Sequence, residues 1–322
     1  MVVDFTFDDT QREIAELAAA VLRREPDQAW KALGQAGLLT LSVPERLGGD
    51  GLGVIETCQV LTEVGKAGVI TPALATLATG VLPIVHMGTP QQQDRLLAEP
   101  GVITAALDGH VAAHDGRLTG TKTHVQYAED ATTVLVTAGS TVYIVDPVDV
   151  TLTRTYSSSG TPEYTVDLVD VRGERLGDAE TLQAFALAGA AAAGDGLLAG
   201  ALRLTAEHVR TREQFGKPLA AFQAVAQQIA DVYVAARTLH LAVWSAIWRL
   251  HTNRDAGLAT DVAAFWLAEE LPLAMHTCHH LHGGIGVDIT YPMHRYYSLA
   301  KDLVRFVGGA EHRLDQLGAR CS

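Results

Sequence analysis

Hydrophobic positions in the first hundred residues recur at the spacing of helices. Asp8 or Asp9 can cap a first helix. Its apolar stripe comprises Ile14, Leu17, Ala18, Val21 and Leu22. The pattern predicts further helices over residues 30–36, 55–66, 72–86 and 90–98, and an extended stretch over residues 38–44. Residues 1–100 are therefore expected to form an N-terminal helical domain.

The pattern changes after residue 100, where β-branched residues replace the helical periodicity. Residues 132–145 are rich in Val, Thr and Ile, and the pair Gly139-Ser140 is typical of a hairpin turn. Residues 151–155 and 164–169 are further strand candidates. We therefore expect a small antiparallel β domain over residues 101–175.

Long helices return in the C-terminal part of the chain. The apolar spacing predicts helices over residues 182–212, 222–251, 261–281 and 296–307. Long helices joined by short turns form antiparallel bundles. The sequence thus predicts a mostly α fold with a small middle β domain and a C-terminal four-helix bundle over residues 176–322.

Composition and charge exclude several classes of protein. Of the 322 residues, 48% are hydrophobic, which excludes a disordered chain. The formal net charge of -13 repels nucleic acid and anionic membranes, so we expect neither as a partner. The longest apolar run, residues 184–194, is shorter than the roughly 20 residues that cross a bilayer. Residues 1–5 lack the basic start of a signal peptide, and three sparse cysteines suit a reducing compartment, so we expect a cytoplasmic protein.

Two motifs suggest a nucleotide site and a metal site, but their sequence context favours a structural role for both. Residues 194–199 fit the G-x-G-x-x-A dinucleotide pattern, but a helix-forming alanine run precedes them where that pattern requires a strand. We interpret these glycines as a place of close helix packing. His276, His279, His280 and His282 cluster at a helix end, where a metal site is conceivable. No acidic or cysteine ligand at suitable spacing completes the set on that face, so we expect no metal.

A charged and aromatic turn between two long helices is the strongest binding candidate. It spans residues 211–219, and the paired donors of the Arg212 guanidinium suit a phosphate. The alternative without a binding role is a surface ion pair of Arg212 with Glu207 or Glu213. Residues 283–286 open a second turn, whose glycines allow close approach of a ligand or a backbone. Two such turns in one bundle indicate a phosphate-bearing cofactor at an intersubunit surface.

These turns and other segments together resemble the acyl-CoA dehydrogenase family over almost the whole chain. The matching segments are residues 33–39, 43–45, Gly48-Gly49, 87–97, Gly120-Thr121-Lys122, 212–219, Phe222-Gln223, 282–286, Tyr291-Pro292 and Arg295. The resemblance implies a flavin-dependent tetramer that removes hydrogens from the α and β carbons of acyl-CoA thioesters. In that family a glutamate takes the α proton, and flavin N5 takes the β hydride. Each flavin lies across a subunit interface, where the neighbouring subunit supplies the arginine and glutamine turn.

The chain departs from the family at both positions of the base. Val307 stands where the glutamate of the last bundle helix would be, and Ala186 occupies the alternative position on an earlier helix. Neither side chain can accept a proton. Asp195 is the only carboxylate of residues 182–202, and its offset matches no base position of the family.

The flavin pocket departs from the family as well. The acidic and glycine-serine loop that should follow residues 103–107 is shortened. His124 replaces the tryptophan that contacts the flavin, and Gln126 replaces a hydroxyl two positions on. Gly309 replaces a threonine, and His280 replaces a glutamine before the double glycine.

The resemblance therefore implies a short, degenerate subunit of a heteromeric, actinobacterial type of acyl-CoA dehydrogenase that acts on steroid side-chain CoA thioesters. Such a subunit has no catalytic residue and completes the FAD site of a homologous partner in a heterotetramer. The cofactor-binding residues it implies are Arg212, Phe215, Gln223, His280, Gly283 and Gly284. Two alternatives stay open: a homomeric flavoenzyme with an unusual base, and a flavin-free structural or regulatory protein on the same fold.

Overall fold

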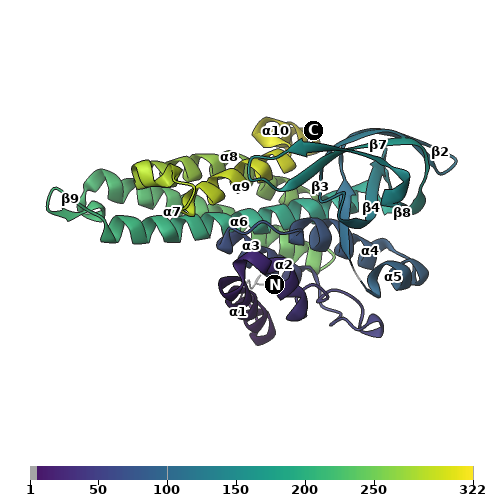
Figure 1. Ribbon diagram of the computed structural model, residues 1–322, viewed down its shortest axis with the longest axis horizontal. Coiled ribbons are helices and arrows are strands. Elements are labelled where there is room, and N and C mark those ends of the chain that lie inside the picture. Colours follow the sequence, from purple (N-terminus) through teal and green to yellow (C-terminus); the bar gives the residue numbers. More distant parts are fainter. Residues whose placement is uncertain (1–5, 100, 322) are drawn as a thin grey trace. The chain divides into compact units, whose positions relative to one another are not determined.

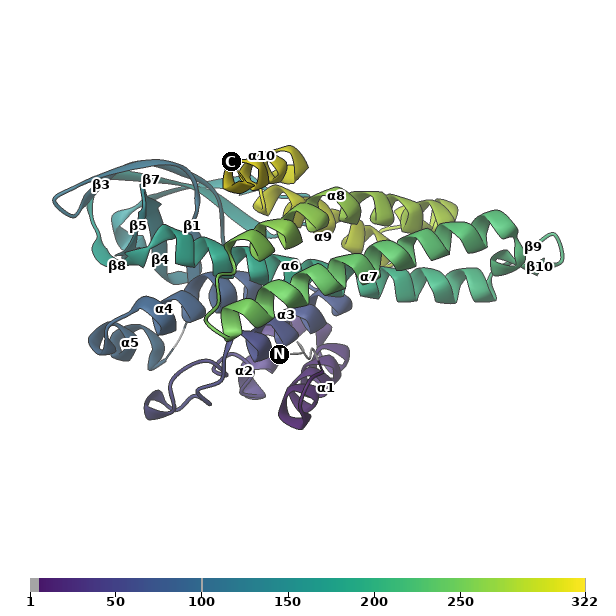
Figure 2. The same ribbon diagram turned by 180° about the vertical axis from the view of Figure 1, so that it is seen from behind.

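The computed structural model describes residues 6–99 and 101–321, and the chain divides into two compact units. The first, called here the bundle unit, comprises Met1–Asp27, Gln59–Val69 and Ala190–Ser322. The second, called the sheet unit, comprises Gln28–Cys58 and Ile70–Gly189. Figures 1 and 2 show the elements from opposite sides. Residues 1–5, on which the signal-peptide argument rests, lie outside the described part. The three-part division of the sequence stays a prediction.

The predicted N-terminal helices are confirmed, because their caps lie where the sequence places them. Helix α1 (Asp9–Arg24) begins after Asp8, whose carboxylate accepts the Gln11 N–H at 2.8 Å. Thr89 caps helix α5 (Pro90–Leu97) in the same way. Helices α2 (Ala29–Gln35) and α3 (Val54–Ala67) also match their predicted ranges.

Residues 38–44 were expected to be extended, and that prediction is wrong. The segment is a series of turns, in which the N–H groups of Thr40 and Val43 donate to the carbonyls of Gly37 and Thr40. The turns bury Leu38 and Val43. The apolar residues of this segment therefore reflect burial within turns and not a strand.

The helix predicted over residues 72–86 exists, but its first part is wider than an α-helix. A π-helical segment, η3 (Leu74–Val81), leads into helix α4 (Leu82–Met87). Pro83 has no N–H to donate to the carbonyl four residues earlier, so the regular α pattern cannot run unbroken through this stretch.

The sheet unit contains two four-stranded sheets, in the orders β1-β4-β5-β8 and β2-β3-β7-β6. The pair β1 and β4 is parallel, and the remaining pairs of these sheets are antiparallel. Buried residues from both sheets share one core cluster. The strands are β1 (Val102–Ala106), β2 (Asp108–His114), β3 (Arg117–Gln126), β4 (Ala131–Ala138), β5 (Thr141–Val145), β6 (Thr151–Tyr156), β7 (Pro162–Arg172) and β8 (Glu174–Asp178). The predicted hairpin at Gly139-Ser140 joins β4 to β5, and the candidates over residues 151–155 and 164–169 are β6 and the middle of β7.

The predicted long helices of the C-terminal part are confirmed, and a further helix follows them. They are α6 (Ala179–Thr211), α7 (Gln223–His251), α8 (Gly257–His282), α9 (Met293–Phe306) and α10 (Gly309–Cys321). Helix α10 lies beyond the predicted ranges because its sequence is mostly polar. Its Arg313 and Arg320 both pair with Asp261, a buried carboxylate on α8, and this charge cluster ties α10 to the bundle.

Helix α6 is the packing centre of the bundle unit. By length and composition it could cross a membrane, but 89% of its apolar window is buried inside the protein, as in the core helices of globular proteins. A Cβ at Gly196 would overlap the Thr62 carbonyl on α3, and one at Gly194 would overlap Leu267 on α8. The interpretation of residues 194–199 as a place of close helix packing is therefore confirmed.

In the sheet unit, Lys122 joins the start of β2 to strand β4. Its side chain is buried, and Nζ donates to the carbonyls of Leu107 and Gly109 at 2.9 and 3.1 Å and to Thr137 Oγ1 at 2.8 Å. Burial lowers the pKa of Lys122 to about 8, against the opposing attraction of Asp108.

This depressed pKa predicts an alkaline rise in stability that Lys122→Met removes. Between pH 8 and the ordinary lysine value of 10.5 the unfolded chain binds more protons than the folded one, so the free energy of unfolding rises with pH. The difference between wild type and variant should shift in favour of wild type by up to about 3 kcal/mol across this window.

Urea denaturation of both proteins from pH 7.5 to 10.5 measures that difference. Burial raises the pKa of the Tyr127 hydroxyl and of the Cys58 thiol, which lowers stability at high pH, but it does so in both proteins alike. A difference that stays flat across the window would contradict the prediction.

Candidate cofactor site

The turn between α6 and α7 is a tight hairpin with an aromatic residue at its tip. Strands β9 (Glu213–Gln214) and β10 (Lys217–Pro218) pair in antiparallel register. Phe215 and Gly216 connect them with φ angles of 51° and 77°, the two positive values that a type I′ turn requires. The left-handed region costs a bulky residue about 1–2 kcal/mol, so this backbone is strained at Phe215.

Phe215 holds its ring in solvent. Its side chain is 91% exposed, and its one ring contact in the described part is an edge contact with Phe222 at 6.3 Å. Lys217 lies over the Phe222 ring at 4.3 Å, which fixes the base of the hairpin. An exposed aromatic on a strained turn is typical of a contact residue for a ligand or a neighbouring chain.

Arg212 stands at the base of the same hairpin with its guanidinium free. Its N–H donates to the His208 carbonyl, and its own carbonyl accepts from the Leu219 N–H, both at 2.8 Å. The alternative of an ion pair with Glu207 is not realised, because Glu207 is held by Arg210 at 2.8 Å. Within the residues that the structure describes, Arg212 has no ion-pair partner and is available to an anion.

A stack of two imidazoles brings this turn together with the glycine turn at the end of α8. The rings of His208 and His282 lie 4.6 Å apart at 23°. His208 is one helical turn before Arg212, and His282 directly precedes Gly283. The two turns that the sequence singled out therefore belong to one region of the bundle unit.

His282 is fixed in a single tautomer. Its Nδ1–H donates to the Cys278 carbonyl at 2.8 Å, which leaves Nε2 as a buried acceptor that has no partner in the described part. Burial lowers the pKa of His282, with the neighbouring His208 and His279 as further causes, so the imidazole is neutral at pH 7. For His208, burial and then the Arg212 charge lower the pKa.

The glycine turn, η6 (Gly283–Val287), presents bare backbone at this place. Gly283 has a φ of 60°, and a Cβ at Gly283 or Gly284 would meet no atom within 4 Å. Gly286 differs, because a Cβ there would lie 2.6 Å from Cδ2 of His279. The turn thus folds over His279 at one end and leaves open space at the other.

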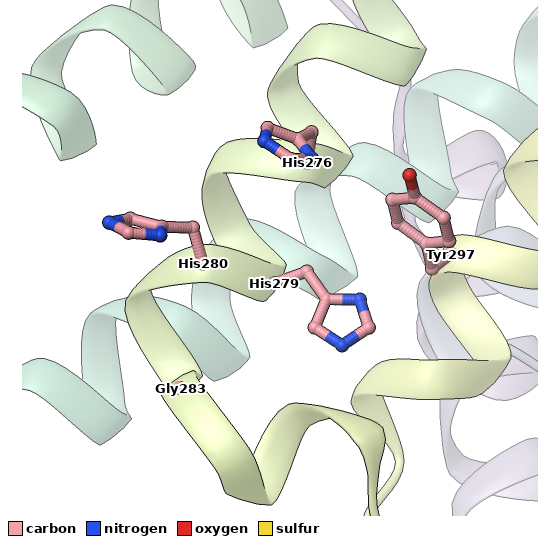
Figure 3. Close-up of a pocket in the computed structure, with 5 residues that line it drawn as sticks. All are labelled: His276, His279, His280, Gly283 and Tyr297. Atoms are coloured by element: carbon pink, nitrogen blue, oxygen red, sulfur yellow. The ribbon is translucent and has the colours of Figure 1, made fainter.

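A pocket of about 420 Å³ lies beside this turn, and Figure 3 shows its lining. His279 points toward Tyr297 of α9, and their rings lie 5.1 Å apart, edge to face. His280 projects from the other side of α8. The lining residues are His276, His279, His280, Gly283 and Tyr297.

Gln223 is exposed as the first residue of α7. Phe222 precedes it and offers no side-chain cap, so the first N–H groups of a 29-residue helix are left for another acceptor. The start of α7 therefore favours a negative charge close to Gln223.

Val307 and Ala186, which the family resemblance places at the two base positions, are both buried. The Val307 side chain is 0% exposed, and its carbonyl accepts from Nε of Arg313. Ala186 is 1% exposed. Asp195 is buried as well, with its carboxylate bonded to Nδ1 of His240 at 2.8 Å. The sequence analysis overlooked His240 because its partner lies 45 residues away on a facing helix.

His124, which stands where the family resemblance places a flavin-contacting tryptophan, is exposed at a positive φ of 58°, with Nδ1 3.6 Å from the Asp108 carboxylate. Across the described ranges no three His, Cys, Asp or Glu side chains converge as a metal site would require.

Comparison with known proteins identifies the family. Residues 1–100 match the model of the acyl-CoA dehydrogenase N-terminal domain, and residues 181–321 match that of the C-terminal domain. The acyl-CoA dehydrogenase FadE28 of Mycobacterium tuberculosis is 49% identical over 99% of both chains. A variant of the Tcur3481-Tcur3483 steroid ACAD superposes with a TM-score of 0.92 at 31% identity, over 97% of both chains. The ChsE4-ChsE5 complex from Mycobacterium tuberculosis gives 0.91 at 30% identity, over 99% of both chains. The chain belongs to the acyl-CoA dehydrogenase family.

Proposed function

We propose that this chain is the non-catalytic subunit of a heteromeric, FAD-dependent acyl-CoA dehydrogenase. One contrast carries the proposal: the residues suited to a cofactor phosphate are exposed, whereas both base positions are apolar and buried. Arg212 and Phe215 project from a strained hairpin, while Val307 and Ala186 are sealed in the protein. Such a chain can complete a site on a neighbour but cannot run the reaction alone.

The residues present fit the adenosine diphosphate half of FAD. A free guanidinium, an uncapped helix start and open glycine backbone all favour a diphosphate. An exposed aromatic ring offers a flat surface for the adenosine. The proposed contact residues are Arg212, Phe215, Gln223, His280, Gly283 and Gly284.

The residues present do not supply the base that accepts the α proton. FAD, when bound, accepts the hydride, and the family's glutamate accepts the α proton. This chain has Val307 and Ala186 at the two base positions, and Asp195 is engaged with His240. The Asp195–His240 pair lines neither the pocket beside Gly283 nor the smaller one around Lys122.

The first half of α7 supports a partner subunit. Within the described residues 223–238, Val232 alone is buried, although the segment is rich in apolar side chains. Tyr233 and Val234 are more than half exposed. A long apolar helix that the rest of its own chain leaves mostly exposed is typical of an interface. We assign this face to a homologous acyl-CoA dehydrogenase subunit that carries the base.

The comparisons support a steroid substrate and a mixed assembly. One similar structure is described as a steroid ACAD made of two named chains, and the other as a complex of ChsE4 with ChsE5. By this likeness we assign the enzyme a steroid side-chain CoA thioester as substrate and a heterotetrameric, two-plus-two assembly. The cytoplasm, expected from cysteine usage, is the proposed location.

The first prediction of this proposal is that the isolated chain does not dehydrogenate acyl-CoA thioesters and is colourless. Loss of general base catalysis costs about 100- to 10,000-fold in rate, so the deficit is plain in a dye-reduction assay. Co-purification with a base-bearing partner should give a yellow, active complex. Robust turnover by the isolated yellow chain would show that it is a homomeric enzyme, and a complex that never acquires flavin would favour a structural role.

The second prediction concerns Arg212. A charge-assisted bond to phosphate contributes roughly 1.5–3 kcal/mol, so Arg212→Ala should weaken FAD binding by the complex by about 10- to 100-fold. Arg212→Lys should recover part of the loss, because an ammonium cannot make the paired contact. Fluorescence titration of the apo complex with FAD measures both.

Arg210→Ala is the matched control for this series, since Arg210 lies two residues away and is already held by Glu207. We expect it to leave FAD affinity unchanged, with helix content and subunit association intact in all three variants. If the Arg212→Ala complex binds FAD with wild-type affinity, Arg212 is not a contact of the cofactor.

The third prediction concerns assembly. Because the face around Tyr233 and Val234 is uncovered in the single chain, the chain alone should be insoluble or form a non-native oligomer. With its partner it should sediment as a two-plus-two complex. A stable monomer in sedimentation velocity runs would contradict the assigned interface.

A further inference from the structure

The pocket at the end of α8 gathers three imidazoles over little more than one helical turn. His276 and His280 are four residues apart, so they are neighbours along the helix surface, and both are exposed. His279 lies between them in sequence and points toward α9 (Figure 3). The pocket therefore has an exposed histidine pair at its surface and a third, enclosed histidine beside it.

The enclosed histidine is locked and neutral. Its ring packs edge-on against Tyr297 at 5.1 Å and lies against the bare α-carbon of Gly286. Its Nε2 is buried and has no partner within the described residues. Burial, followed by the charges of His276, Lys301 and His294, lowers the pKa of His279. The lowered pKa makes His279 a poor proton acceptor near neutral pH.

The neighbouring elements bring charged and titratable groups close to His279. Helix α9 contributes Lys301, whose Nζ lies 4.7 Å from the centre of the Tyr297 ring, and His294, whose Nδ1–H donates to the Tyr291 carbonyl at 2.6 Å. The nearby carboxylate of Asp288 accepts the N–H and hydroxyl of Thr290 at 2.8 and 2.7 Å.

We propose that the His276–His280 pair takes up a proton when the diphosphate of the flavin binds at this pocket, so that this subunit holds the cofactor more tightly as the pH falls through neutrality. This inference rests on the proposed function. Imidazole titrates near neutral pH, and an adjacent anion favours its charged form. The proton comes from the buffer and forms an N–H bond on one ring. For one proton per site, linkage lowers FAD affinity by at most about tenfold per unit rise in pH.

Calorimetric titration of the apo complex with FAD tests the coupling directly. Experiments at pH 7.0 in phosphate and in Tris differ in heat by the buffer ionisation enthalpy times the protons taken up. Wild type should take up about 0.5–1 proton per FAD, and its Kd should rise several-fold, about three- to tenfold, between pH 6.5 and 7.5.

The double variant His276→Gln/His280→Gln should bind FAD with almost no proton uptake and with a Kd that is flat with pH. Glutamine keeps a hydrogen-bonding amide but does not titrate. Both positions are exposed, so the variant is expected to fold, and circular dichroism checks that it does. His114→Gln is the control, because His114 is 94% exposed on β2 of the sheet unit, and it should retain wild-type uptake.

The possible outcomes distinguish failure of the proton coupling from failure of the proposed function. FAD binding without proton uptake in wild type, or equal uptake in wild type and the double variant, overturns the proton coupling and leaves the proposed function standing. Failure of the complex to bind FAD at any pH overturns the proposed function and the coupling with it.

Discussion

The stacked rings of His208 and His282 hold the candidate site together. Each ring belongs to the last turns of a long helix, and each lies within one helical turn of a binding segment. Without that contact, the arginine hairpin and the glycine turn would be unrelated loops of the bundle. The stack needs at least one neutral ring, because two adjacent imidazolium ions repel. Burial meets this requirement by lowering the pKa of both histidines.

The two positions that the family resemblance gives to the base lie in closely packed surroundings. Helix α6 packs so closely on its neighbours that glycines are needed at Gly194 and Gly196. Near the start of this helix Ala186 is fully enclosed, and at the end of α9 Val307 is sealed as its carbonyl accepts from Arg313. Both positions are therefore enclosed within the single chain.

Most of the helical architecture could be predicted from the sequence, and the reasons for the failures are physical. Helices with a clear apolar stripe or a cap such as Asp8 appear where predicted. Helix α10 could not be found in this way, because its attachment depends on the pairing of Asp261 with Arg313 and Arg320 from far along the chain. The turns over residues 38–44 imitate a strand in composition alone. In the candidate site, the exposed residues were predicted by family resemblance, whereas the contacts of His208 and His240 depend on tertiary packing that no local pattern encodes.

The Phe215 hairpin has a consequence for the thermodynamics of association. A flexible loop loses conformational freedom when it docks, and that loss opposes binding. The type I′ turn adopts its unfavourable backbone geometry during folding, with φ angles of 51° and 77°. The backbone that carries the ring is therefore fixed before any neighbour arrives, so docking at this turn orders few additional backbone dihedrals. Preorganisation of this kind lowers the entropic cost of association for whatever chain or ligand contacts Phe215.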